Sequence, residues 1–267
     1  MRCIVAAAVF ITAFAGKASV VDTLWIATDY LSSPENVIVI VPDVAAQKAC
    51  PTLYLLHGYS GNHLSWSTHT RPDLPLLSDK YGMIIVMPDG RDSWYWDSTV
   101  DPQMQMESFF VNALVPYIDD NYNTISQADR RAITGLSMGG HGAMWLAMRH
   151  PDIWKNAGSM SGGLDIRPFP NNWKMKDRIG PKDENEDVWE SHSVINLVPS
   201  LTPGELNITF DCGVDDFFYE VNNNLHAALI EARIPHDYTS RPGAHTQEYW
   251  ANSILYHLLF FNENFNK

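Results

Sequence analysis

The chain has 267 residues, of which 45% are hydrophobic and 18% are charged, which is enough for one large α/β domain or two small ones with an ample core. Its formal net charge is −13, and it lacks basic runs and basic residues interleaved with aromatic ones, which argues against nucleic acid as a partner. No segment is apolar and long enough to span a membrane.

The amino terminus has the pattern of a secretory signal peptide. Arg2 precedes an apolar stretch that ends at Ala15 and is too short to cross a bilayer. Small residues allow cleavage after Ala18 or, alternatively, after Ala15. We therefore expect residues 1–18 to be removed from an exported protein, periplasmic or secreted, and residues 19–267 to form a single domain.

Apolar strand-like segments alternate with helical patterns along this domain. In chain order the pattern predicts strands at 20–26, 37–41 and 52–56, a helix at 74–80, a strand at 83–87, a helix at 107–122, a strand at 131–134, a helix at 140–148, strands at 157–160 and 207–211, a helix at 219–232, a strand at 237–239 and a helix at 248–261. Such alternation favours an α/β fold with a mostly parallel central sheet and helices on both faces.

One long stretch, residues 162–206, interrupts the alternation. It is rich in Pro, Asn, Lys, Asp and Glu and has no clear periodicity. We expect it to be an insertion that forms a small, irregular partial cap over the sheet.

Two cysteines, Cys50 and Cys212, belong to the predicted domain. Two cysteines in an exported protein suggest a disulfide bond. However, Cys50 precedes one predicted strand and Cys212 ends another, and opposite ends of parallel strands lie roughly 20 Å apart at about 3.3 Å per residue. The sequence therefore predicts two free, buried thiols.

The segment Gly135-Leu136-Ser137-Met138-Gly139 has the form G-x-S-x-G between a predicted strand and a predicted helix. A serine on such a sharp turn holds its hydroxyl out of the sheet, and a Cβ at either glycine would clash in the bend. The helix amino terminus also aims free N–H groups at the reacting atoms. This context predicts Ser137 as a nucleophile.

A serine hydroxyl becomes a good nucleophile when a histidine, oriented by a carboxylate, takes its proton. In this arrangement the acid and the histidine follow the serine, each on a loop at the end of a strand. Asp216 is the predicted acid because it lies on the loop after a buried strand; Asp215 is the alternative, and Asp211, still on the strand, is less favoured. His245 is the predicted base, since it lies between the last strand and the last helix.

The tetrahedral intermediate of such a reaction needs hydrogen-bond donors for its oxyanion. One predicted donor is the backbone N–H of Met138, which follows the nucleophile, and the other is that of Tyr59 on the loop after an earlier strand. His57 and Gly58 of that loop are expected beside the substrate, where the glycine leaves room for the backbone to approach. The alternative is an ordinary glycine-rich turn.

Metal catalysis and cofactors are not indicated. His57, His63 and Asp89 are conceivable ligands, but the chain has no H-E-x-x-H motif and no zinc-type spacing of Cys and His. It also has no phosphate-cradling or dinucleotide-binding glycine pattern. We expect no metal and no cofactor.

With these residues placed, the chain resembles the esterase D-like branch of the α/β-hydrolases, and in particular secreted tributyrin-esterase-like and feruloyl-esterase-like proteins. The segments that carry the resemblance are Leu55–His63, Ser93–Tyr95, Thr134–Ala143, Asp211–Phe217 and Pro242–His245. The resemblance implies the α/β-hydrolase fold, a Ser137, Asp216 and His245 triad, an oxyanion hole at Tyr59 and Met138, and hydrolysis of carboxylic esters without a cofactor. Cytosolic relatives hydrolyse S-formylglutathione, but this chain lacks the cysteine that they carry after the oxyanion loop, which disfavours that substrate.

Aromatic residues suggest the substrate. Trp94 and Trp96 follow a strand end and are expected at the rim of the site, where Trp173 and Phe169 of the cap could join them; burial in the core is the alternative. Together with export, this rim points to acetyl or feruloyl esters on plant polysaccharides or oligosaccharides. The other readings are a short-chain, tributyrin-type esterase, an acyltransferase on the same triad, and a non-catalytic carbohydrate-binding protein.

Overall fold

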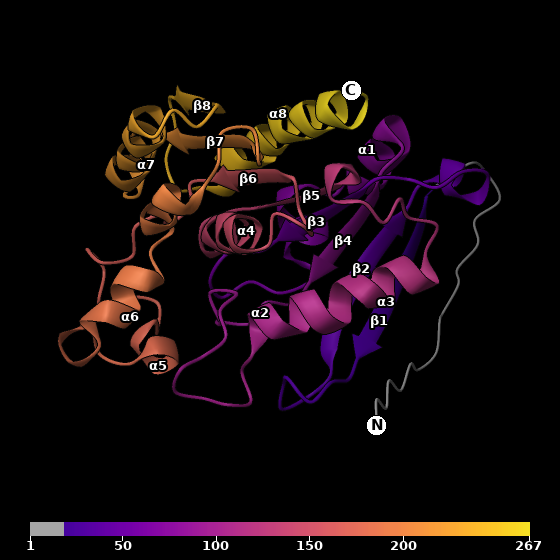
Figure 1. Cartoon of the computed structure of the whole chain (residues 1–267). Coiled ribbons are helices and arrows are strands. Elements are labelled where there is room, and N and C mark those ends of the chain that lie inside the picture. The colour runs from indigo at the N-terminus through magenta and orange to yellow at the C-terminus, as the bar shows by residue number, and fades with distance from the viewer. Residues whose placement is uncertain (1–18) are drawn as a thin grey trace.

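An eight-stranded sheet forms the centre of the structure, a computed structural model that describes residues 19–267 (Figure 1). The predicted signal peptide, residues 1–18, lies outside the described residues. The strand order is β1-β2-β4-β3-β5-β6-β7-β8, and only the pairs made by β2 are antiparallel. The strands are β1 (Val20–Ile26), β2 (Glu35–Val41), β3 (Thr52–Leu56), β4 (Ile84–Pro88), β5 (Arg131–Gly135), β6 (Asn156–Met160), β7 (Asn207–Gly213) and β8 (His236–Arg241).

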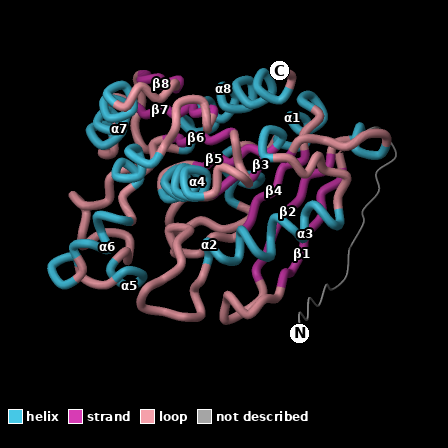
Figure 2. Tube along the Cα trace, viewed as in Figure 1, coloured by secondary structure: helices cyan, strands magenta, loops and turns pink. Residues whose placement is uncertain are grey.

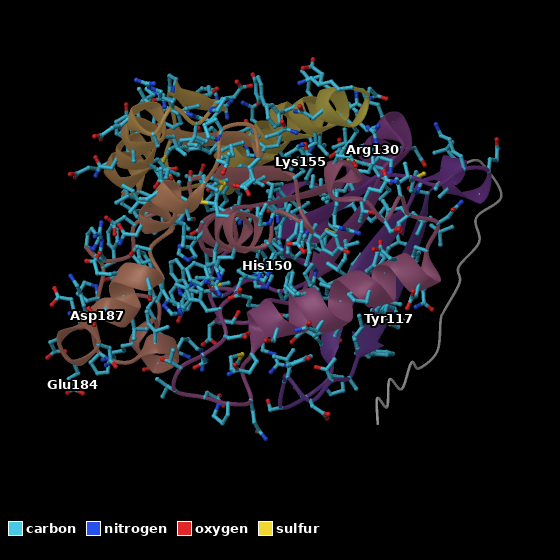
Figure 3. All side chains as sticks on the ribbon, viewed as in Figure 1. Tyr117, Arg130, His150, Lys155, Glu184 and Asp187 are labelled. Carbon is cyan, nitrogen blue, oxygen red and sulfur yellow. The ribbon has the colours of Figure 1, made fainter. Side chains whose placement is uncertain are left out.

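Helices cover both faces of this sheet (Figures 1 and 2), and side chains fill the space between the sheet and the helices (Figure 3). Alternate side chains of β3 face opposite cores: Tyr54 and Leu56 pack with residues of α2, α3, α4 and α7, whereas Leu53 and Leu55 pack with residues of α1 and α8. The predicted α/β-hydrolase fold, a mostly parallel sheet between two helical layers, is confirmed. The helices are α1 (Leu74–Tyr81), α2 (Met106–Phe109), α3 (Val115–Asn121), α4 (Met138–Arg149), α5 (Lys176–Ile179), α6 (Glu186–Ser191), α7 (Tyr219–Glu231) and α8 (Gln247–Phe265).

The helix predicted at 107–122 is interrupted by one π-helical turn. A π-helical turn, Phe110–Leu114, joins α2 to α3 in one continuous segment. Pro116 explains the wider turn, because it has no N–H to donate to the Asn112 carbonyl and its ring would clash with that carbonyl in a regular α-helix.

The segment 162–206 is more regular than its composition indicates. It contains the short helices α5 and α6 and ends in a 3₁₀ turn, Val194–Ser200, that packs against α4 and α7. In Figure 1 this orange segment lies at one flank of the molecule. The indole of Trp189 is buried there and donates to the Gly180 carbonyl at 2.9 Å, so this segment has a small core of its own.

The register of the parallel strands brings distant loops together. Leu56 at the end of β3 pairs with Gly135 at the end of β5, and Gly213 at the end of β7 pairs with Arg241 at the end of β8. The loops that follow these four strands therefore open on one edge of the sheet. The two cysteines, Cys50 and Cys212, are both free and buried, as predicted.

Candidate active site

Ser137 occupies a strained turn between β5 and α4. Its backbone has φ 56° and ψ −118°, a conformation that non-glycine residues rarely adopt. The turn is packed tightly against the end of β3, because a Cβ at Gly135 would lie 2.6 Å from the Gly139 carbonyl oxygen and a Cβ at Gly139 would lie 2.6 Å from the His57 carbonyl oxygen. The two glycines of the motif are therefore required by close backbone approach.

Three side chains form a hydrogen-bonded chain at this edge of the sheet. His245 Nε2 lies 2.9 Å from Ser137 Oγ, and His245 Nδ1 lies 2.8 Å from Asp216 Oδ2. Since a carboxylate only accepts, Nδ1 carries the proton and Nε2 presents a lone pair to the serine hydroxyl. This tautomer is the one that can take the proton of Ser137.

The structure distinguishes the three candidate acids. Asp216 is 5% exposed, and its second oxygen accepts the Phe218 N–H at 2.8 Å, which fixes the carboxylate toward His245. Asp215 is exposed to solvent. Asp211 is buried under α8, where Ser253 donates to it at 2.7 Å. Only Asp216 of the three contacts the histidine.

Two backbone N–H groups near the serine have no acceptor within the described residues. Met138 is the first residue of α4, so its N–H has no partner within the helix. Within residues 19–267, neither this N–H nor that of Tyr59 donates to a protein group. The two loops touch closely, because a Cβ at Gly58 would lie 2.6 Å from Leu136 Cδ1 and 3.3 Å from Ser137 Cβ. The predicted oxyanion donors are therefore held beside the serine.

His57 supports this loop through its side chain. The ring is 1% exposed, accepts the Gly90 N–H on Nε2 at 2.7 Å and donates from Nδ1 to the Gly58 carbonyl at 2.8 Å. The Tyr95 hydroxyl donates to the His57 carbonyl at 3.0 Å. Both ring nitrogens are thus occupied, and the side chain shapes the oxyanion loop.

An open cleft of about 550 Å³ lies over Ser137 and is lined by both aromatic and polar side chains. The aromatic side chains are those of Trp173, Phe217, Trp250 and Tyr59. The polar side chains are those of Ser60, Asn62, Ser65, His69, Thr70 and Gln247.

Trp94 and Trp96 do not line this cleft, which corrects the expectation for both. They are 1% and 0% exposed, and their rings stack on one another with centroids 5.5 Å apart. Trp96 Nε1 donates to the buried His141 at 2.8 Å, and Trp94 Nε1 donates to the Trp173 carbonyl at 3.2 Å. Trp94 therefore supports Trp173, which does line the cleft, from beneath.

The cleft also contains residues that the sequence pattern did not single out. Phe217 is 52% exposed and stacks on Trp173 with centroids 5.7 Å apart and planes at 23°. Its position directly after Asp216 was an available signal, because that loop must lie beside the histidine. Nothing in the pattern pointed to Thr70 or Gln247, which come from segments 177 residues apart.

Two other kinds of feature are absent from the described residues. Residues 19–267 contain no group of three or more His, Cys, Asp or Glu side chains placed to hold a metal ion. In the same part of the chain no helix is both long enough and apolar enough to cross a bilayer.

The fold and this site define a serine hydrolase of the α/β class. Over residues 28–261 the chain matches the family model described as "Putative esterase". The chain belongs to this esterase family and is a carboxylic ester hydrolase.

Three similar proteins illustrate the range of the relationship. The chain is 26% identical to bovine S-formylglutathione hydrolase over 84% of its length and 88% of that protein. It is 26% identical to an acetyl esterase of Caldicellulosiruptor saccharolyticus over 76% of its length and 80% of that protein. The solved structure of a ferulic acid esterase superposes with a TM-score of 0.78 at 29% identity, covering 92% of this chain and 98% of the other.

Proposed function

We propose that Ser137, His245 and Asp216 are the catalytic triad and that the enzyme works through an acyl-enzyme. His245 Nε2, 2.9 Å from the serine Oγ, accepts the hydroxyl proton while Oγ attacks the ester carbonyl. The tetrahedral oxyanion is stabilised by the N–H groups of Tyr59 and Met138. His245 then gives the proton to the leaving alcohol, and water repeats these steps on the acyl-enzyme.

Asp216 acts through the histidine. Its Oδ2 accepts the hydrogen bond from Nδ1–H, with the two heavy atoms 2.8 Å apart, and its side chain is shielded from solvent. A buried carboxylate in this position stabilises the imidazolium that forms during attack and keeps Nε2 free to act as base. The hydrogen-bonded chain from Asp216 to Ser137 is the observation that carries the proposal.

The substrate that suits the cleft best is an acetyl or feruloyl ester carried by a plant polysaccharide or oligosaccharide. The Trp173 and Phe217 rings offer an aromatic surface for a phenolic acyl group or for the C–H face of a sugar. The hydroxyl and amide groups that also line the cleft suit sugar hydroxyls. Relatives named acetyl esterase and ferulic acid esterase support this choice.

A panel of esters tests the substrate. The purified enzyme would be assayed on acetylated xylan, methyl ferulate, S-formylglutathione and p-nitrophenyl butyrate, with Ser137→Ala as the control. We expect turnover of acetylated xylan or methyl ferulate that disappears in Ser137→Ala. Activity confined to the butyrate ester would instead identify a short-chain esterase, and product transfer to an added alcohol would identify an acyltransferase.

Labelling separates a catalytic from a non-catalytic protein. A fluorophosphonate probe is expected to modify Ser137, and the site of modification would be read by peptide mass spectrometry. An unlabelled Ser137 would indicate a carbohydrate-binding protein on a hydrolase scaffold.

Export is a further part of the proposal. The apolar stretch after Arg2 has the length of a signal peptide, and it is followed by the small residues that a signal peptidase recognises. The intact mass of protein recovered from the periplasm or the medium would show whether the chain starts after Ala18.

A further inference from the structure

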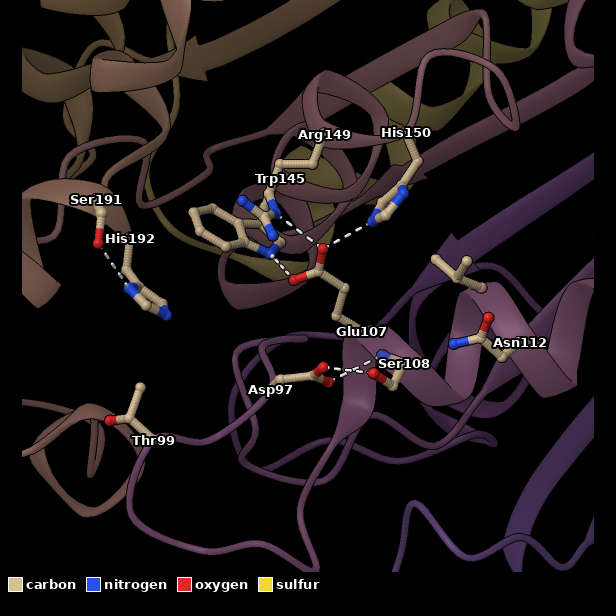
Figure 4. Close-up of a pocket in the computed structure, with 11 residues that line it drawn as sticks. Asp97, Thr99, Glu107, Ser108, Asn112, Trp145, Arg149, His150, Ser191 and His192 are labelled. Carbon is tan, nitrogen blue, oxygen red and sulfur yellow. Dashed lines mark hydrogen bonds and ion pairs between the residues drawn. The ribbon is translucent and has the colours of Figure 1, made fainter.

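A second cleft of about 430 Å³ lies at the carboxyl end of α4 (Figure 4). Ser137 precedes the amino end of the same 12-residue helix, so the two sites are separated by about 18 Å of helix at 1.5 Å per residue. The second cleft shares none of its lining residues with the cleft over Ser137. The proposed ester hydrolysis therefore does not use it.

The floor of this cleft is buried and fully hydrogen-bonded. The Glu107 carboxylate accepts from Trp145 Nε1 at 3.0 Å, from Arg149 Nε at 2.8 Å and from His150 Nε2 at 2.7 Å (Figure 4). Burial alone would raise the pKa of Glu107, but the hydrogen bonds from His150 and Arg149 outweigh it and hold the pKa below its ordinary value. Glu107 thus stays ionised and anchors the donors around it.

The rim, by contrast, carries polar groups that have no protein partner, and three of its residues, Thr99, Asn112 and Arg149, are exposed to solvent. Within residues 19–267, no protein group hydrogen-bonds the Thr99 hydroxyl, the Asn112 side-chain amide or the terminal guanidinium nitrogens of Arg149. His192 stacks on Trp145 with centroids 5.0 Å apart and donates from Nδ1 to the Val188 carbonyl at 2.7 Å. Its Nε2 has no partner in the same part of the chain.

These rim groups include both hydrogen-bond donors and hydrogen-bond acceptors. Burial lowers the pKa of His192, so its ring is neutral near pH 7 and Nε2 presents a lone pair. Arg149 offers only donors, whereas Asn112 and Thr99 offer both a donor and an acceptor. The rim can therefore bind groups that donate and accept at once, as hydroxyls do.

Charged ligands fit this arrangement poorly. An anion could pair with Arg149 but would also lie near the carboxylates of Asp97 and Glu107 and the lone pair of His192, and a cation would lie near Arg149. We propose that this cleft is a second, non-catalytic binding site for a neutral saccharide, whose hydroxyls pair with the unpartnered groups of Thr99, Asn112, Arg149 and His192. Binding of a saccharide in this second cleft goes beyond the proposed function, because it does not involve an ester or the residues around Ser137.

Binding of xylotriose tests the proposal. Isothermal titration calorimetry would compare wild-type enzyme, the double variant Thr99→Val/Asn112→Ala and the control Asn121→Ala, an exposed asparagine farther along the same helical segment. Fluorophosphonate-labelled enzyme would be titrated in parallel, since the label blocks the cleft over Ser137. Glucuronate and inorganic phosphate would be titrated as anionic probes.

We expect xylotriose to bind labelled and unlabelled enzyme alike, and about 10-fold more weakly in the double variant, which loses two hydrogen-bonding side chains. Asn121→Ala should bind as wild type, and both variants should hydrolyse p-nitrophenyl acetate as wild type. His192→Phe, which keeps the stack on Trp145 but removes Nε2, should weaken binding in the same direction.

Equal affinity in the double variant, loss of all binding on labelling, or binding of the anions in place of xylotriose would each overturn the proposal. If only the proposed substrate is wrong, the enzyme will be inactive on acetylated xylan but will still bind xylotriose.

Discussion

The ring of Phe217 lies against the imidazole of His245, with centroids 4.2 Å apart and planes at 37°. Trp250 contacts the same imidazole edge-on at 4.7 Å. In the proposed mechanism His245 passes its proton to the leaving alcohol, so we expect the alcohol to leave beside Phe217. An exposed aromatic ring in this position can contact the alcohol portion of the substrate directly.

Replacement of Phe217 tests that contact. We expect Phe217→Ala to raise KM for acetylated xylan about 3- to 10-fold, the loss of one aromatic contact, and to change kcat/KM for p-nitrophenyl acetate by less than about 3-fold. Steady-state kinetics would measure both values. Leu76→Ala, at a side chain 69% exposed on α1, is the control and should leave both unchanged. An equal loss on both substrates would place Phe217 in support of His245 instead.

The two neighbouring acids make a matched pair. Asp216→Asn should reduce kcat by about 10⁴-fold, because an amide at 2.8 Å from Nδ1 favours the wrong imidazole tautomer. Asp215→Asn, at the exposed neighbour, should stay within about 3-fold of wild type. Similar losses in the two variants would contradict the assignment of the acid.

Removal of the nucleophile should abolish the chemical step. Ser137→Ala is expected to lower kcat/KM for p-nitrophenyl acetate by at least about 10⁴-fold, leaving the contribution of the oxyanion donors and of binding. Thermal unfolding of the variant would verify that the fold is retained. Residual activity above about 1% of wild type would exclude Ser137 as the nucleophile.

A side chain at Gly58 would crowd the serine turn. A methyl group there would lie 2.6 Å from Leu136 Cδ1 and 3.3 Å from Ser137 Cβ, so Gly58→Ala should displace Tyr59 N–H from the serine. We expect kcat to fall about 10²- to 10³-fold, the usual cost of one lost oxyanion donor. Gly204→Ala is the control: its methyl group would meet no atom within 4 Å, and although its φ of 83° should cost some stability, its kcat should be unchanged.

A buried carboxyl at the start of β2 makes stability depend on pH. Burial raises the pKa of Glu35 from 4.5 to about 8, and the pairing with Arg91 at 2.8 Å opposes this shift without cancelling it. The folded protein therefore holds this proton more tightly than the unfolded chain. The stability that this group contributes is complete below pH 4.5 and is lost as the pH rises through about 8.

Urea unfolding at several pH values measures this dependence. We expect the free energy of unfolding of the wild type to fall between about pH 5 and pH 8, and the Glu35→Gln variant, which cannot ionise, to show a smaller fall. Parallel curves for the two proteins would contradict the assignment.

The sequence patterns predicted the architecture of the sheet and the three loops that carry the proposed triad. The alternation of buried strands with amphipathic helices predicted the sheet, because side-chain periodicity reflects burial on one face or on both. The serine turn, the acid loop and the histidine loop were recognisable for a related reason. Each lies at the carboxyl end of a strand. The carboxyl ends of parallel strands lie at the same edge of the sheet, regardless of the length or conformation of the connecting segments.

Tertiary structure alone decided which neighbours in a loop face the site. Trp94 and Tyr95 both have positive φ angles, 57° and 66°, which turn the chain inward and bury the aromatic residues that were expected at the rim. Asp216 and Asp215 are adjacent and chemically identical, and only the path of the loop after β7 points one of them at His245. The stacked rings of Trp173 and Phe217 come from two loops that lie far apart in the sequence. No sequence pattern relates these loops, because they contact each other only in the folded chain.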